Sequence, residues 1–215
     1  MEINYDEIRK IDNSYLVQYV SQEHKKLING RAGNEHYKLL VYLTKQIQNG
    51  FIVELGTHYG TSSLALSVNP SNQIRTYDLV DRFSTKITVP NVTRCIGNIF
   101  EMNEAYFLLK ANLVFLDTAH LGDFEWQVFQ FLKNNNYRGI FLCDDIVWSD
   151  KMIEFWDKVD MPKYDITDIG HGKGDGPRGN ISGTGVVDFS GQLVIKRSKE
   201  KRPFWLPEAL QSLFS

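Results

Sequence analysis

Five short apolar runs alternate with segments of helical length through the middle of this chain. The runs are FIVEL, IRTYDL, VTRCI, LVFLD and GIFLCDD, and they begin at residues 51, 74, 92, 113 and 139. Runs this short and this apolar are typical of strands in a parallel sheet whose two faces are both covered by helices. The alternation therefore predicts a doubly wound α/β fold.

Further elements are expected on either side of this core. Residues 4–28 and 34–48 carry apolar side chains at spacings of three and four, which predicts two amphipathic helices before the first strand. After the last run, Ser149 is a favourable N-cap for a helix over residues 149–159. The segments YDITDI and GTGVVDF then predict two late strands that form a hairpin-like end.

A single domain is expected over residues 1–215, because a second independent core would be cramped. It would comprise N-terminal helices over 1–49, an α/β core over 50–197 and a tail over 198–215 that docks on the domain or mediates a homodimer. Residues 170–185 hold seven glycines, too many for a regular element. This segment is either an ordinary surface loop or a lid over a site.

The charge balance and the cysteines narrow the classes of partner. Lys and Arg number 24 against 26 Asp and Glu, so the net charge of −2 disfavours nucleic acid as a partner. No apolar run approaches the ~20 residues that cross a bilayer, and the polar start lacks the apolar segment of a signal peptide. A soluble, cytoplasmic protein is expected. Cys95 and Cys143 lie in apolar runs, so both are expected in the core and a disulfide framework is not.

The stretch VELGTHYGTSS joins the first predicted strand to the helix after it. Such a turn exposes backbone N–H groups at the carboxyl edge of a parallel sheet, and glycine lets a ligand approach closely. Gly56 and Gly60 form GxxxG, which matches neither the dinucleotide fingerprint nor the P-loop. Glu54 would repel a phosphate and attract a cation, while Asp78 can accept both hydroxyls of a ribose. The pattern predicts an adenosine ligand with a cationic centre.

Those features together resemble the class I S-adenosylmethionine-dependent methyltransferases, over roughly residues 50 to 190. The resemblance implies a Rossmann-like, mostly parallel seven-stranded sheet with an antiparallel C-terminal strand, and S-adenosylmethionine as cofactor. Where the family has an acidic residue that holds the adenine amine, this chain has Asn98 after Gly97. The cofactor-binding residues that the resemblance implies are Glu54, Gly56, Thr57, His58, Gly60, Ser62, Asp78, Asn98 and Asp117.

Three carboxylates are expected at the same edge of the sheet. Asp117 ends the fourth apolar run, and Asp144 and Asp145 end the fifth. Clustered carboxylates repel one another unless a cation or proton lies among them, which favours Mg²⁺ or another hard divalent cation. Alternatively, one of the pair caps the following helix and the other is solvated.

The same layout resembles the metal-dependent O-methyltransferases of the catechol type, whose ligands are an aspartate after the fourth strand and an Asp-Asn pair after the fifth. Here Asp117 and Asp144 match, Asp145 replaces the asparagine, and His120 stands where that family has its catalytic lysine. The motifs ELGTHYG, DTAH, DDI and GTGVV also resemble bacterial methyltransferases associated with sugars, some of which carry His-Asp in place of Asp-Asp. That second resemblance leaves the need for a metal open.

The expected activity is methyl transfer from S-adenosylmethionine to a hydroxyl of a small molecule, such as a sugar or polyol. The protein would align oxygen, methyl and sulfur and make the oxygen nucleophilic. His120, or a metal held by Asp117, Asp144 and Asp145, would do the latter. Two other readings remain: a nicotinamide-dependent oxidoreductase, weakened by the missing GxGxxG, and a non-catalytic domain that keeps the cofactor pocket.

Overall fold

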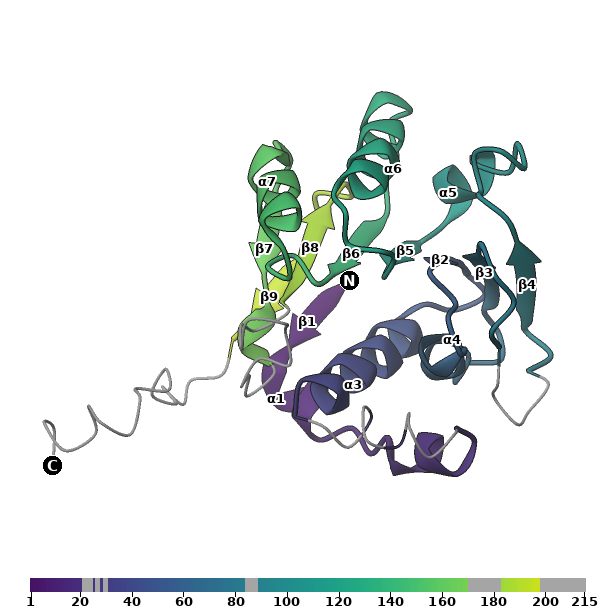
Figure 1. Cartoon of the computed structure of the whole chain (residues 1–215). Helices are drawn as coiled ribbons and strands as arrows, with labels where there is room; N and C mark the ends of the chain where they lie inside the picture. Colours follow the sequence, from purple (N-terminus) through teal and green to yellow (C-terminus); the bar gives the residue numbers. More distant parts are fainter. Residues whose placement is uncertain (21–24, 26–27, 29–30, 84–88, 170–182, 198–215) are drawn as a thin grey trace, which may run out of the picture.

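A seven-stranded sheet forms the centre of the protein (Figure 1). The computed structural model describes residues 1–20, 25, 28, 31–83, 89–169 and 183–197. The strand order is β4-β3-β2-β5-β6-β8-β7, and β8 alone runs antiparallel to its neighbours in that sheet. The strands are β2 (Phe51–Leu55), β3 (Gln73–Asp78), β4 (Val92–Ile96), β5 (Leu113–Leu116), β6 (Ile140–Asp144), β7 (Lys163–Asp165) and β8 (Thr184–Asp188). The predicted doubly wound fold with a late antiparallel strand is confirmed.

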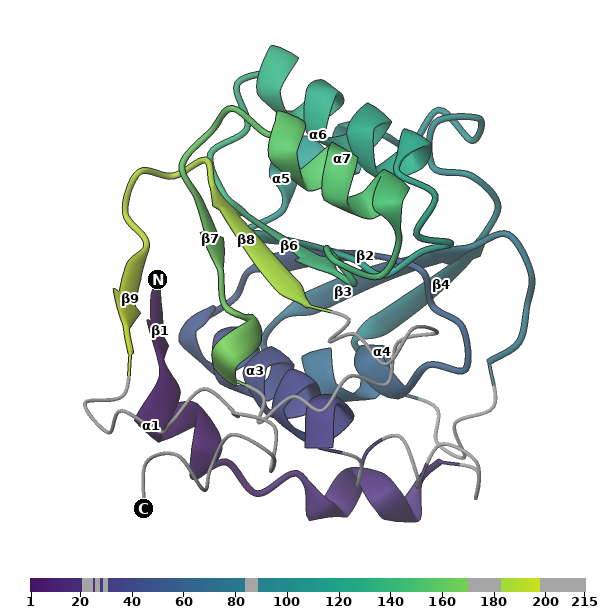
Figure 2. The same ribbon diagram turned by 60° about the vertical axis from the view of Figure 1, so that its left-hand side comes forward.

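Helices cover both faces of the sheet (Figure 2). One layer contains α5 (Tyr106–Lys110), α6 (Asp123–Asn134) and α7 (Asp150–Lys158), and the other contains α3 (Arg31–Gln46) and α4 (Thr61–Leu66). The hydroxyl of Ser149 accepts a hydrogen bond from the Met152 amide and caps α7, as the sequence predicts. Two apolar clusters fill the space between the sheet and these layers, and every residue of β5 is buried because it faces both.

The N-terminal segment differs from the long helix expected over residues 4–28. The chain begins with β1 (Glu2–Asn4), a short α1 (Tyr5–Arg9) and the 3₁₀ helix η1 (Ser14–Gln18). Asp12 explains the interruption, since its carboxylate accepts the Ser14 amide in a local turn that competes with the helix. β1 pairs in parallel with β9 (Val194–Lys196) in a separate two-stranded sheet that the sequence did not predict.

Two other expectations concern the late part of the chain. YDITDI is only partly a strand, because β7 ends at Asp165 and the 3₁₀ helix η2 (Thr167–Ile169) follows. The tail 198–215 and residues 170–182 of the glycine-rich segment lie outside the described residues. Across the described part of the chain, the helices all lack the length and apolar character that crossing a bilayer requires.

The topology fixes where a site can form. The chain runs outward from β2 to β3 and β4, then returns to place β5 on the other side of β2. Ligands of open α/β sheets bind in the crevice beyond the carboxyl ends of the strands where the order reverses in this way. In this protein that point lies between the ends of β2 and β5, where Gly56 and Asp117 stand.

Candidate active site

The turn after β2 is held against the sheet by its own backbone. The amides of Gly56 and Thr57 both donate to the Tyr77 carbonyl of β3, at 2.8 and 3.2 Å. Gly56 has φ of 101°, and a Cβ added there would lie 1.7 Å from the carbonyl oxygen of Asp117. Only glycine fits this position, because both its backbone conformation and its contact exclude a side chain. The turn after β2 and the loop after β5 are therefore in direct contact.

The remainder of the turn is closed by the carboxylate of Asp78. Its Oδ2 accepts the His58 amide at 2.7 Å, and its Oδ1 accepts the Val80 amide at 3.1 Å. His58 has φ of 45°, a left-handed conformation that turns its amide toward the carboxylate. Asp78 is half-buried at the end of β3, so the sequence placed it correctly beside the turn. Each carboxylate oxygen can accept a second hydrogen bond.

Gly60 and Thr57 complete the approach to α4. Gly60 precedes the helix with φ of 83°, and an added Cβ would lie 2.3 Å from the ring of Phe83. The hydroxyls of Thr57 and Thr76 lie 2.5 Å apart, which ties the turn to β3. Ser62 is buried in the first turn of α4. The predicted cofactor-binding residues of this stretch thus form one ordered turn rather than a loose loop.

Glu54 lies deeper than its predicted role requires. Its side chain is 0% exposed, and its Oε2 accepts a hydrogen bond from the Ser63 hydroxyl. Burial raises the pKa of Glu54 to about 7, although hydrogen bonds from Ser62, Ser63 and Thr76 oppose the rise. Among the described residues its Oε1 has no hydrogen-bond partner. Any attraction of Glu54 for a cation at the turn therefore acts through intervening protein.

Asn98 lies beside the end of β3, next to Asp78. The Gly97 amide donates to the Asp78 carbonyl at 2.7 Å, which fixes the start of this loop. The side-chain Oδ1 of Asn98 then accepts the Phe100 amide at 2.9 Å. Asn98 is half-buried at the sheet edge, and the contact to adenine that the family resemblance implies for it stays a prediction.

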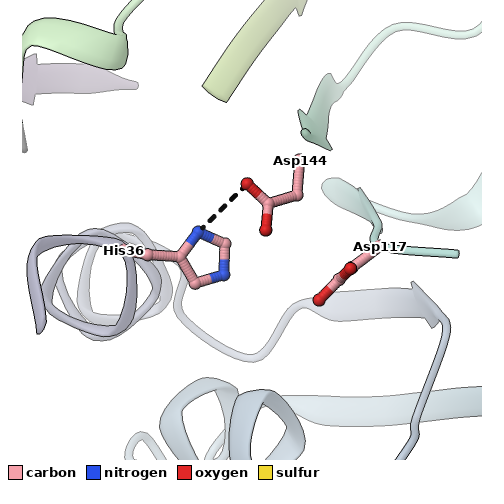
Figure 3. A group of neighbouring side chains, drawn as sticks. All are labelled: His36, Asp117 and Asp144. Carbon is pink, nitrogen blue, oxygen red and sulfur yellow. Dashed lines mark ion pairs between the residues drawn. The ribbon is translucent and has the colours of Figure 1, made fainter. Parts of the chain in front are cut away.

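A histidine that sequence reasoning missed joins two of the predicted aspartates (Figure 3). His36 reaches from α3 toward Asp117 and Asp144, which follow β5 and end β6. Its Nδ1 lies 3.6 Å from Oδ1 of Asp144, and one ligand atom from each of the three residues lies within 4.8 Å of the others. Its spacing one turn before Leu40 places it on the buried stripe of the helix, but this spacing does not distinguish a ligand from a core residue.

His120 gathers a second, overlapping group with Asp117 and Asp145. Its Nε2 lies 3.0 Å from Oδ2 of Asp145 and 3.5 Å from Oδ1 of Asp117. The Ser149 hydroxyl donates to the His120 carbonyl at 3.0 Å and so links this loop to α7. The three predicted metal ligands thus lie at one edge, but the structure divides them between two groups that share Asp117. A single three-aspartate metal site stays a prediction.

The charges of these groups depend strongly on one another. Burial raises the pKa of Asp117 to about 7 and that of Asp144 to about 8, and repulsion from neighbouring carboxylates adds to both shifts. Burial lowers the pKa of His120, but the hydrogen bond and charge of Asp145 outweigh it and raise the value to about 9. Burial also lowers the pKa of His36. Near neutral pH these carboxylates therefore tend to hold protons, and a bound cation could displace those protons.

The residues present fit a divalent cation. Each group offers two carboxylates and one imidazole, the ligand types that divalent metals take in proteins. Nδ1 of His36 is buried without a hydrogen-bond partner in the described part of the chain, as a ligand atom awaiting a cation would be.

Comparisons with known proteins place the fold. No family model and no curated protein matches the chain. Among solved structures, cofactor-bound Rv0187 from MTB is 15% identical with a TM-score of 0.54, over 86% of each chain. The O-methyltransferase TomG from Streptomyces achromogenes, in complex with S-adenosylmethionine, is 16% identical with a TM-score of 0.50, over 82% of this chain and 95% of that one.

A third structure, the methyltransferase PaMTH1 from Podospora anserina bound to S-adenosylhomocysteine, is 12% identical with a TM-score of 0.50, over 86% of this chain and 85% of that one. The predicted resemblance to class I S-adenosylmethionine-dependent methyltransferases is thus confirmed at the level of the fold. At these identities the likeness concerns the fold alone, and a shared fold does not fix the activity.

Proposed function

We propose that this protein transfers a methyl group from S-adenosylmethionine to a hydroxyl of a small molecule, with a sugar or polyol as the favoured class of acceptor. The observation that carries the proposal is the contact between Gly56 and the Asp117 carbonyl. It joins the turn that suits an adenosine ligand to the loop that bears Asp117 and His120. A methyl donor in the turn would therefore lie beside groups that can accept a proton.

The donor site is the ordered turn after β2. Asp78 would receive the ribose hydroxyls on its remaining acceptor sites, and Asn98 would contact the adenine. The glycine backbone lets the methionine portion approach without a Cβ in the way. The buried charge of Glu54 would favour the positive sulfonium when that carboxylate is ionised.

The reaction requires little covalent chemistry from the protein. The acceptor oxygen forms a bond to the methyl carbon as the bond from carbon to sulfur breaks, and the hydroxyl proton is released to a base. Because Asp145 holds the pKa of His120 at about 9, His120 carries a proton at neutral pH in the metal-free protein. Asp117, with a pKa of about 7, is then the better proton acceptor of the two.

A divalent cation held by Asp117 with Asp144 or Asp145 would lower the pKa of a bound hydroxyl. Its charge would also favour the neutral form of His120 and return that imidazole to use as a base. Without the cation, His120 would instead orient the loop through its pairs with Asp117 and Asp145.

Calorimetry with S-adenosylhomocysteine tests the donor site. We expect micromolar binding to the full chain, at least tenfold weaker binding to Asp78→Ala, and no measurable binding of NADH. Asp160→Asn is the matched control, because Asp160 is exposed and pairs only with Lys133 among the described residues. Tight binding of NADH with none of S-adenosylhomocysteine would support the oxidoreductase reading instead.

Transfer of labelled methyl groups to a panel of sugars and polyols tests the reaction. We expect product from at least one acceptor and a loss of more than tenfold in rate for Asp117→Asn. Cofactor binding without transfer to any hydroxyl compound, amine or thiol would favour a non-catalytic domain.

A further inference from the structure

We propose that His36, Asp117 and Asp144 form a mixed nitrogen and oxygen site that selects a first-row transition-metal ion such as Mn²⁺ or Zn²⁺ over Mg²⁺. The inference rests on the proposed function for its catalytic meaning, since the metal would lie beside the expected acceptor. The metal binding itself can be measured without cofactor or acceptor.

The geometry suits coordination better than a direct hydrogen bond. Nδ1 of His36 and Oδ1 of Asp144 lie 3.6 Å apart, longer than the ~2.7–3.2 Å of a hydrogen bond. Two ligand atoms that each lie ~2.1 Å from a tetrahedral ion are about 3.4 Å apart, which is close to that separation. The ligand atoms of all three residues lie within 4.8 Å of one another, so small side-chain movements would let one ion contact all three.

His36 is buried as a ligand would be. Its side chain is 11% exposed, and its Nδ1 is wholly buried with no hydrogen-bond partner among the described residues. The ring of His36 packs at 5.4 Å from the ring of Phe115 in β5. Figure 3 shows the imidazole pointing toward Asp117 and Asp144. A buried ring nitrogen without a partner is costly, so this position calls for a group that accepts its lone pair or its proton.

The Asp144 carboxylate is supported from a second strand. The Thr184 hydroxyl of β8 donates to Oδ1 of Asp144 at 3.4 Å, and this partner helps to orient that carboxylate. Ligands are commonly held in this way by groups that do not touch the metal. The three ligands come from α3, the end of β5 and the end of β6, so the site would also hold α3 against the sheet.

The donor set decides the class of metal. Mg²⁺ prefers oxygen ligands and gives up its water reluctantly, whereas imidazole suits Zn²⁺ and its neighbours in the first row. A site with three aspartates would favour Mg²⁺ or Ca²⁺. Exchange of one carboxylate for His36 therefore shifts the preference toward a transition metal, and leaves Asp145 to pair with His120.

Electron paramagnetic resonance of Mn²⁺ bound to the full chain tests this inference. After chelator treatment and without cofactor, we expect a pulsed spectrum with ¹⁴N coupling that changes to ¹⁵N coupling when the histidines are labelled. We also expect Mg²⁺ to displace Mn²⁺ only at concentrations at least about tenfold higher. Equal competition by Mg²⁺, or no nitrogen coupling, would overturn the proposal.

Matched variants identify which histidine supplies the nitrogen that binds the metal. His36→Ala, which keeps a good helix former in α3, should remove the coupling and weaken Mn²⁺ binding about tenfold or more. His120→Asn should retain both, because asparagine tolerates the left-handed backbone at that position. Loss of the coupling in His120→Asn alone would assign the metal to Asp117, His120 and Asp145 and refute the proposal.

A second variant guards against misfolding. Asp144→Asn should weaken Mn²⁺ binding without altering the helix at His36, and circular dichroism should match the parent chain.

Failure of the metal proposal is distinguishable from failure of the proposed function. Binding of S-adenosylhomocysteine without nitrogen coupling refutes only the metal site, whereas nitrogen-coupled Mn²⁺ without such binding refutes only the methyltransferase assignment.

Discussion

Nε2 of His120 lies 3.0 Å from Oδ2 of Asp145, and both residues have left-handed backbones, with φ of 56° and 58°. Such conformations are uncommon outside glycine and cost of order 1–3 kcal/mol each. Two of them facing each other across the carboxyl edge of the sheet place the imidazole and the carboxylate in contact. Strain of this kind gathers at functional sites, which agrees with the proposed role of this pair.

The first prediction concerns the charge of His120. Asp145→Asn removes the hydrogen bond and charge that hold the pKa of His120 at about 9, and burial then lowers it. Nuclear magnetic resonance titration of the ring should show a midpoint at least one pH unit lower in the variant. Asparagine suits the left-handed backbone at residue 145, so the fold should persist. An unchanged midpoint would contradict the proposed pairing.

Glu54 should make stability fall as the pH rises. Its folded pKa of about 7 lies above its ordinary value of 4.5, so its contribution is complete below pH 4.5 and is lost as the pH rises through 7. Glu54→Gln should therefore be more stable than the parent at pH 8, by at most about 3 kcal/mol, and similar to it at pH 5. Urea unfolding at both pH values measures this.

The matched control for that change is Glu154→Gln. Glu154 is exposed and pairs with Lys158, so we expect little change in stability at either pH. A gain at pH 8 in the control equal to that of Glu54→Gln would show that burial is not the cause. Asp117 and Asp144 titrate in the same direction, so the slope should flatten in Glu54→Gln without vanishing.

The central strands could be predicted from sequence because burial on both faces makes them nearly all apolar. The five predicted runs differ from β2 to β6 by at most one residue at either end. Asp117 and Asp144 followed from the same logic, since residues at the carboxyl ends of adjacent parallel strands meet at one edge. The alternation could not reveal the break at Asp12, which depends on a local hydrogen bond to Ser14.

His36 could not be predicted in the same way. A histidine on the buried stripe of a helix is common, and nothing near it in sequence distinguishes a ligand from a core residue. Its meaning comes from Asp117 and Asp144, which tertiary packing brings to it from two distant strands. The burial of Glu54 could not be predicted either, because the Ser63 hydroxyl that donates to its carboxylate comes from the next helix.

Ser149 is expected to act on both stability and rate. Its hydroxyl accepts the Met152 amide at 3.2 Å and donates to the His120 carbonyl at 3.0 Å. Ser149→Ala should cost about 1 kcal/mol through the lost cap, and under the proposed function it should lower methyl transfer several-fold by loosening His120. Denaturation and initial rates measure the two effects separately.

Asn4→Ala provides the comparison, since Asn4 caps α1 through the Glu7 amide. It should reduce stability by about 0.5–2 kcal/mol without changing the rate. Equal rates of methyl transfer in Ser149→Ala and Asn4→Ala would contradict the proposed link between α7 and the loop that bears His120.

Gly56→Ala should be one of the most damaging single substitutions in the chain. Gly191 has φ of 67° with nothing within 4 Å of an added Cβ. Gly191→Ala should therefore lower the free energy of unfolding only by the cost of a left-handed alanine, about 1–2 kcal/mol. Gly56→Ala has the same backbone strain and also presses a methyl group against the Asp117 carbonyl. The turn after β2 and the loop after β5 must then separate. Urea unfolding should therefore show a clearly larger loss for Gly56→Ala, accompanied by loss of S-adenosylhomocysteine binding in calorimetry. Equal losses in the two variants would mean that the two loops are not in contact in solution, and the proposed alignment of donor and base would fail with them.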